Sequence, residues 1–170
     1  MTDPACGVAH GTPGPEGTGR VLVAVFASPV AGVLQRWAPE LGFHAVLLDP
    51  DPARGAGVGS FADLTEDLAD ADVVVTDHHR PELGEVLRDA LARRVRWVGV
   101  MGNPRHEGPH VAALAALGVP PEEVARVHRP IGLDIGSRTP AEIALSTLAG
   151  LLADRNGRTG GPHAGAGTAH

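Results

Sequence analysis

The sequence predicts a single α/β domain in which helices cover both faces of a parallel sheet. Short runs of β-branched and apolar residues alternate along the chain with stretches whose apolar residues recur every three or four positions. The first pattern is typical of strands buried on both faces, and the second of amphipathic helices. Strands that alternate with helices over short connections form parallel βαβ units, so we expect a doubly wound sheet.

Five buried strands are expected. They lie at residues 21–27, 45–48, 73–76, 97–101 and 127–131. Between them, apolar spacing predicts helices at residues 30–41, 81–93 and 111–117, and a short helix at 61–68. The clearest helix start is a capping box: Thr139 at the N-cap, Pro140 in the first helical position and Glu142 three residues after the cap. This box predicts a last helix that runs to about Arg155.

Both ends of the chain lack the bulky apolar residues that a core requires. Residues 1–19 are rich in glycine and proline, and residues 156–170 consist of small and polar residues. Such compositions bury too little apolar area to offset the entropy of ordering. We therefore expect disordered tails at 1–19 and 156–170, with one domain at 20–155.

Composition excludes several classes of function. The net charge is −6 and no basic run occurs, which argues against nucleic-acid and anionic-membrane partners. No apolar run is long enough to span a bilayer and no signal peptide is recognisable, so a cytoplasmic protein is expected. Cys6 is the only cysteine, which excludes an intrachain disulfide and a cysteine-based zinc site.

Lysine and tyrosine are absent from the chain. A P-loop and a pyridoxal-phosphate enzyme both need a lysine, and a short-chain dehydrogenase needs a tyrosine and a lysine together. None of the four serines has the flanking glycines of a hydrolase nucleophile elbow. These enzyme classes are therefore not expected.

In doubly wound sheets the functional residues follow the carboxyl ends of the strands. This rule selects residues 28–30, 49–51, 77–80, 102–105 and 132–138. In the last segment Asp134, Ser137 and Arg138 surround two glycines beside a helix N-terminus, an arrangement that suits an anion such as a phosphate group. The alternative is a turn that glycine permits, in which Asp134 accepts hydrogen bonds from nearby amides.

Histidines raise two further hypotheses. His78 and His79 follow the third strand and could bind a metal or transfer protons, although adjacent side chains diverge unless a turn brings them together; the alternative is a solvated turn. Residues 106–110 match the zinc-protease pattern H-E-x-x-H. Gly108 and Pro109 lie between its histidines and oppose a regular helix there, so a polar helix start is expected and no metal site.

Residues 128–146, HRPIGLDIGSRTPAEIALS, resemble the signature of the C-terminal Rossmann-like domain of the XdhC/CoxI family of xanthine dehydrogenase accessory proteins. Residues 97–102, WVGVMG, resemble the family's aromatic-x-Gly-x-x-Gly strand, and residues 43–50 resemble its second strand with the terminal acid. Family members serve molybdenum hydroxylases: they hold the molybdenum cofactor and assist its sulfuration and insertion. The resemblance therefore implies a Rossmann-like fold and a maturation factor that is not itself an enzyme.

The resemblance and the strand-end rule together give the expected cofactor contacts. Asp49 and His78 are included because the family carries an acid after its second strand and Asp and His after its third. The full set is Asp49, His78, Gly102, Asn103, Arg105, Gly132, Asp134, Gly136, Ser137 and Arg138. The implied cofactor is the molybdenum cofactor, molybdopterin, and the implied partners are a molybdenum hydroxylase client and a second copy of this chain.

Two departures from the family limit what the resemblance implies. The family's first strand runs into Gly-x-Gly-His, but Phe26, Ser28 and Pro29 stand here, and they obstruct the close approach of a pyrophosphate. NAD(P) binding is therefore disfavoured, and Asp49, placed where a ribose-binding acid would stand, is left to cap a strand end. The family's N-terminal cysteine domain is also missing, so a separate chain would supply that cysteine. The alternatives are an NAD(P)-binding oxidoreductase and a degenerate Rossmann module that binds only a partner.

Overall fold

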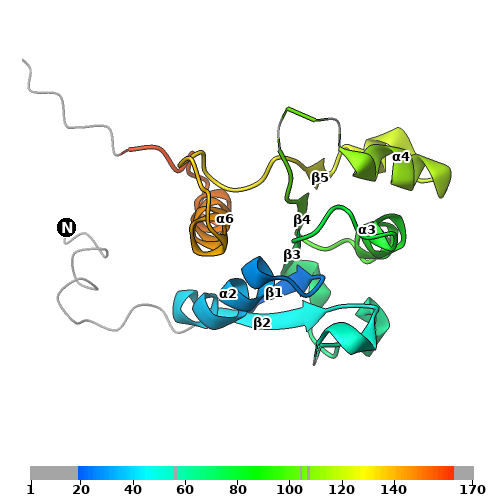
Figure 1. The fold of residues 1–170 in the computed structure, drawn as a ribbon, viewed down its shortest axis with the longest axis horizontal. Helices are drawn as coiled ribbons and strands as arrows, with labels where there is room; N and C mark the ends of the chain where they lie inside the picture. The colour runs from blue at the N-terminus through cyan, green and yellow to red at the C-terminus, as the bar shows by residue number, and fades with distance from the viewer. Residues whose placement is uncertain (1–18, 56, 104, 107, 163–170) are drawn as a thin grey trace, which may run out of the picture.

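Five parallel strands form one sheet in the computed structural model, which describes residues 19–55, 57–103, 105–106 and 108–162 (Figure 1). The strand order is β2-β1-β3-β4-β5. The strands are β1 (Arg20–Val25), β2 (Phe43–Leu48), β3 (Ala71–Val75), β4 (Trp97–Val100) and β5 (Val127–His128). The order reverses between β1 and β3, so the predicted doubly wound, Rossmann-like sheet is confirmed.

Helices cover both faces of this sheet. On one face lie α2 (Pro29–Trp37) and α6 (Pro140–Arg155), and on the other α3 (Leu83–Ala92), α4 (Pro109–Ala116) and the short α5 (Pro121–Val124) (Figure 1). Alternate residues of each strand point to opposite faces. In β1, Leu22 packs with the α2 and α6 core, whereas Val23 packs with the α3 and α4 core. Because side chains on both faces of β1 are buried, its sequence is a continuous run of apolar residues.

The last helix begins as the capping box predicts. The Thr139 hydroxyl accepts from the Glu142 amide at 3.2 Å, and the Glu142 carboxylate accepts from the Thr139 amide at 3.1 Å. Buried Asp72 fastens the other end of this helix to the sheet, because it accepts from Arg155 at 2.8 Å and from Arg96 at 2.6 Å. The helix is therefore held at both ends, and its N-terminus is fixed at the carboxyl edge of the sheet.

Two predicted elements are shorter in the structure than the sequence predicts. The fifth strand contains two residues instead of five, because Pro130 has no amide to donate to a ladder. The helix predicted at 30–41 ends at Trp37, and a 3₁₀ turn at Pro39–Leu41 follows because Pro39 lacks an amide.

The helix predicted at 61–68 is wrong. Short 3₁₀ turns stand at Phe61–Asp63 and Leu68–Asp70, in addition to one at Pro52–Arg54. Local side-chain hydrogen bonds compete with helix formation there: Ser60 donates to Asp63 at 2.8 Å, and Asp67 accepts from the Ala69 amide at 3.0 Å.

The predicted domain bounds coincide with the first residue of β1, Arg20, and the last of α6, Arg155. Residues 1–18 and 163–170, which belong to the predicted tails, lie outside the described residues. Within the predicted C-terminal tail, the Arg158 amide donates to the Ala153 carbonyl at 2.8 Å. No helix among the described residues is both long and apolar enough to cross a bilayer.

Candidate binding site at the carboxyl edge of the sheet

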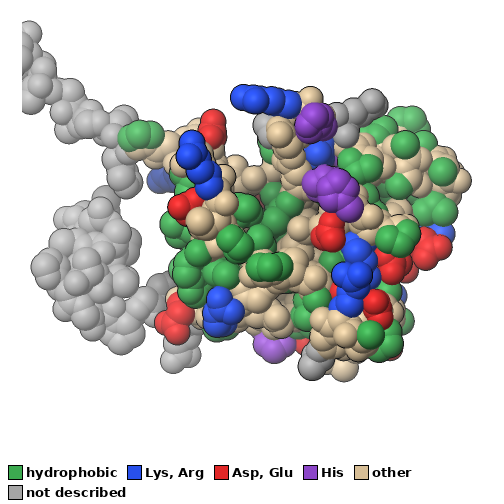
Figure 2. All heavy atoms as spheres, in the orientation of Figure 1, with side chains coloured by type: hydrophobic (Ala, Val, Ile, Leu, Met, Phe, Trp, Pro, Cys, Tyr) green, Lys and Arg blue, Asp and Glu red, His purple; other side chains and the backbone are tan. Residues whose placement is uncertain are grey.

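A groove of about 860 Å³ lies where β3, β4 and β5 end. Of the ten predicted contact residues it is lined by eight: His78, Gly102, Asn103, Gly132, Asp134, Gly136, Ser137 and Arg138. Val30 of α2 and Ser146 of α6 also line the groove. Histidine and arginine side chains gather around a hollow on the face seen in Figure 2. The strand-end rule thus located a cavity that three strand ends share.

The loop between β5 and α6 forms one wall of the groove. Gly132 and Gly136 have φ of +83° and +68°, a left-handed conformation that favours glycine. A side chain at Gly132 would collide with the Ser146 hydroxyl. Ser146 donates to the Leu133 carbonyl at 2.7 Å, and its own carbonyl accepts from the Leu133 amide at 3.2 Å. The start of the loop is therefore fastened to α6, and the residues after Leu133 are free to present backbone groups to the groove.

The N-terminus of α6 is not available to an anion in the way that the sequence predicts. The Glu142 carboxylate already accepts from the amides of Arg138, at 2.6 Å, and Thr139, at 3.1 Å. These backbone hydrogen bonds lower the pKa of Glu142, so it stays charged and would repel a phosphate placed there. The chain thus fills its own helix-end anion site.

Other donors in the same loop remain. Within the described part of the chain, the amides of Asp134, Gly136 and Ser137 have no hydrogen-bond acceptor. The Asp134 carboxylate is exposed and accepts no hydrogen bond from the described residues, so the alternative in which it caps the turn is not formed. Three amides, together with the Arg138 side chain on the groove wall, are the donors that could meet an anionic ligand.

Asp49 does not face the groove. It is 4% exposed and accepts two hydrogen bonds from Arg80, at 3.0 and 3.1 Å. The amides of Ala27, at 2.8 Å, and Asp51, at 2.9 Å, donate to the same carboxylate. Burial alone would raise the pKa of Asp49, but these hydrogen bonds outweigh it and the pKa is lowered. The acid that could hold a ribose is instead bound to the chain's own arginine.

In the first turn after β1, Phe26, Ser28 and Pro29 stand where the resemblance leads one to expect Gly-x-Gly-His. Phe26, where the family carries its first glycine, has φ of +70°, so the backbone keeps the glycine conformation beneath a phenylalanine. Its ring is fully buried, and the Arg80 guanidinium lies 4.6 Å from the ring centroid. Ser28 caps α2 by accepting from the Ala31 amide at 3.0 Å and donates to Thr76 at 2.8 Å. Side chains therefore occupy the space that a pyrophosphate would need.

A second hollow, of about 530 Å³, adjoins the groove and shares His78 and Asn103 with it. The turn after β3 brings the adjacent histidines together, because their ring centroids are 4.1 Å apart. The His79 amide donates to the Asp77 carboxylate at 2.9 Å, which fixes this turn. Burial, followed by the positive charges of His79 and Arg129, lowers the pKa of His78.

The residues of the H-E-x-x-H match do not form a zinc-protease helix. α4 begins at Pro109, so His106 precedes it while buried His110 lies in its first turn. Glu107 lies outside the described residues. Where the structure describes the chain, no three potential metal ligands cluster together.

Arg129 is the site residue that sequence reasoning missed. It donates to the carbonyls of His106, at 2.7 Å, and Asn103, at 3.3 Å, and any side chain at Gly102 would collide with its guanidinium. The sequence did not predict it as a site residue because it falls within the strand predicted at 127–131. Gly102 was the available signal, since a glycine after a strand can mark a position where another side chain packs against the backbone. Arg105, by contrast, is exposed and lines neither hollow; its amide donates to the Asn103 side chain at 2.9 Å.

Comparisons with known proteins give the family. The chain is similar to the uncharacterised protein YqeB of Escherichia coli, strain K12, at 36% identity over 77 residues, which cover 45% of this chain and 14% of YqeB. It is also similar to the crystal structure of a xanthine dehydrogenase from Bacillus halodurans, with a TM-score of 0.64 and 25% identity. That match covers 82% of this chain and 45% of the other, so the chain spans less than half of either relative. The model of the XdhC Rossmann domain matches residues 22–151, and the chain therefore belongs to the XdhC Rossmann-domain family.

Proposed function

We propose that the chain is a non-catalytic accessory protein that helps to mature a molybdenum hydroxylase of the xanthine or CO dehydrogenase type, and that it binds or hands over the molybdenum cofactor in the groove. The observation that carries this proposal is the groove itself. It lies at the ends of β3, β4 and β5, and its wall is the Gly132 to Arg138 loop of the family signature. The similarity to the Bacillus halodurans xanthine dehydrogenase supports the choice of client.

The residues present fit a phosphorylated pterin. The groove volume of about 860 Å³ falls in the range of small-molecule sites, roughly 300–1,000 Å³. Arg138 and the amides of Asp134, Gly136 and Ser137 would hold the phosphate, and Asn103 would hydrogen-bond the pterin edge. When bound, the cofactor would supply the redox chemistry of the client enzyme. This chain's residues would bind it, orient it and shield it from water.

The rival function, an NAD(P)-dependent oxidoreductase, is disfavoured by the first turn. A dinucleotide needs a glycine cradle for the pyrophosphate and a free acid for the ribose. Phe26 fills the cradle, and Asp49 is paired with Arg80. Among the described residues that line the groove, the hydroxyls of Ser137, Ser146 and Thr147 donate to backbone carbonyls, so none of these three donates to a general base. We propose a cytoplasmic protein that also associates with a second copy of itself.

A binding titration tests the proposal. Molybdenum cofactor released from a molybdenum hydroxylase is titrated anaerobically into the purified chain, with NAD and NADP in parallel. We expect saturable cofactor binding that weakens at least about tenfold in Arg138→Ala, because a charge-assisted hydrogen bond is lost. Arg36→Ala, at the exposed end of α2, is the matched control and should bind as the native chain does.

The same titration separates the three functions. Tight nicotinamide binding without cofactor binding would refute the proposal in favour of the oxidoreductase. If neither ligand binds while the client enzyme still associates with the chain, the degenerate interaction module is correct.

A further inference from the structure

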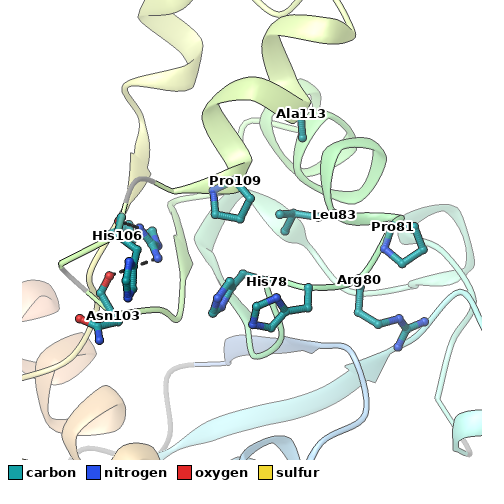
Figure 3. Close-up of a pocket in the computed structure, with 10 residues that line it drawn as sticks. His78, Arg80, Pro81, Leu83, Asn103, His106, Pro109 and Ala113 are labelled. Atoms are coloured by element: carbon teal, nitrogen blue, oxygen red, sulfur yellow. Dashed lines mark hydrogen bonds between the residues drawn. The ribbon is translucent and has the colours of Figure 1, made fainter.

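The hollow beside the groove is lined by basic and neutral groups alone among the described residues. His78, His79, His106 and Arg129 contribute cationic or protonatable side chains, and no aspartate or glutamate belongs to the lining. This is notable in a chain whose net charge is −6. Figure 3 shows His78, Asn103, His106 and Pro109 around the hollow, with the Arg80 side chain pointing away from it. Arg80 is paired with Asp49, so Arg129 is the guanidinium of the lining that has no carboxylate partner among the described residues.

Arg129 lacks a carboxylate partner among the described residues. Two of its nitrogens donate to backbone carbonyls of the β4–α4 loop, and its buried Nε has no hydrogen-bond partner in the described structure. The loop therefore fixes the position of this guanidinium, and no described carboxylate is paired with it. Fixed arginines of this kind favour planar or tetrahedral oxyanions, because the ordering of the side chain has already been achieved.

The N-terminus of α4 opens on the same hollow, since Pro109 in its first position belongs to the lining. α2 and α6 are capped by side chains, and α3 carries Glu85 in its first turn. α4 has neither a side-chain cap nor an acid in its first turn, so no described residue of that turn offsets its partial positive charge. The helix end adds to the charge of the histidines and Arg129 rather than providing a site by itself.

We propose that this hollow is a second binding site, specific for a phosphate group, with His79, His106 and Arg129 as its principal ligand-binding residues. The phosphate is either a free ion or the phosphomonoester end of a larger molecule. The proposal does not require that the groove takes the molybdenum cofactor, because two of the three residues, His79 and His106, do not line the groove. Phosphate binding at this site would need no metal ion, because the side chains of His79, His106 and Arg129 would contact the phosphate oxygens directly.

Calorimetric titration of the full chain with inorganic phosphate and with glycerol 3-phosphate, at pH 6.5 in 150 mM NaCl, tests this site. We expect saturable binding of at least one of them, and a tenfold or greater loss of affinity in the double variant His79→Gln, His106→Gln. Both side chains lie on surface turns outside the core, so the variant should fold, which circular dichroism checks. Tighter binding of glycerol 3-phosphate would identify a phosphomonoester, and tighter binding of inorganic phosphate a free ion.

His44→Gln is the matched control, because this exposed histidine lies on β2 beside Glu66 and outside the hollow. It should leave the phosphate affinity unchanged. Absence of saturable binding by the native chain, or an equal loss in His44→Gln, would overturn the proposal. The double variant should retain cofactor binding in the groove, so a failure of this site and a failure of the proposed function give different results.

Discussion

Substitution of Phe26 by glycine and, separately, by alanine tests whether the first turn keeps a glycine conformation beneath a phenylalanine. Both variants lose a fully buried ring, which costs about 3–5 kcal/mol of unfolding free energy. At φ of +70° an alanine also bears strain of roughly 1–2 kcal/mol, which glycine avoids. Glycine loses about 0.4–1 kcal/mol more conformational entropy on folding. The midpoints of the two ranges leave the glycine variant more stable than the alanine variant by about 0.8 kcal/mol.

Urea denaturation at 25 °C, followed by circular dichroism, measures this difference. Leu34 provides the matched pair, because it is also fully buried but lies inside α2 with ordinary helical backbone. There the usual order holds, and Leu34→Ala should be more stable than Leu34→Gly by about 1 kcal/mol. If Phe26→Ala is as stable as Phe26→Gly or more so, the backbone at this position is not left-handed in solution and the account of the first turn is wrong.

Three further predictions concern stability. Arg80→Met should lower the unfolding free energy by about 3–5 kcal/mol, because it leaves Asp49 buried without its cation, and adding Asp49→Asn should recover part of the loss in urea denaturation. Folding lowers the pKa of Asp49, so the charged Asp49 stabilises the folded state fully at pH values above its ordinary pKa of 3.8. This stabilisation is lost as the pH falls through the lowered pKa of the folded state. The unfolding free energy of Asp49→Asn should therefore not show this loss when it is measured at decreasing pH. Thr139→Ala should cost about 1 kcal/mol in thermal or urea unfolding, and Thr139→Ser should not, because only alanine removes the cap of α6.

Periodicity was sufficient to predict the central strands β1, β3 and β4 because nearly all of their residues are buried, and an apolar run reports that burial directly. Apolar periodicity does not predict where a strand or helix ends when a proline, which has no backbone N–H to donate, interrupts it. Pro130 shortens the last strand, and Pro39 divides the second predicted element into a helix and a 3₁₀ turn. Around Asp67, local hydrogen bonds outweigh a spacing of leucines that suggests a helix. These competing interactions are short-ranged, but their strength depends on the rotamers that neighbouring packing allows.

The candidate site also has a part that the sequence predicted and a part that it did not. The strand-end rule placed Gly102, Asn103 and the Gly132 to Arg138 loop in one groove, because parallel strands must all end at the same edge. It could not foresee that Arg80 reaches Asp49 across 31 residues, or that Arg129 holds the loop at Asn103. Such pairings depend on the direction in which a long side chain leaves its turn. The sequence pattern carries no record of that direction.

Because His78 and Asn103 form part of both hollows, the two sites cannot behave as separate compartments. A phosphate beside His78 would favour its protonated ring and so change the charge that this residue presents to the groove. A ligand in the groove would alter the phosphate affinity by the same factor in return, since coupling between two binding equilibria is reciprocal. Occupancy of the smaller hollow would then act as a signal for loading or release at the larger one.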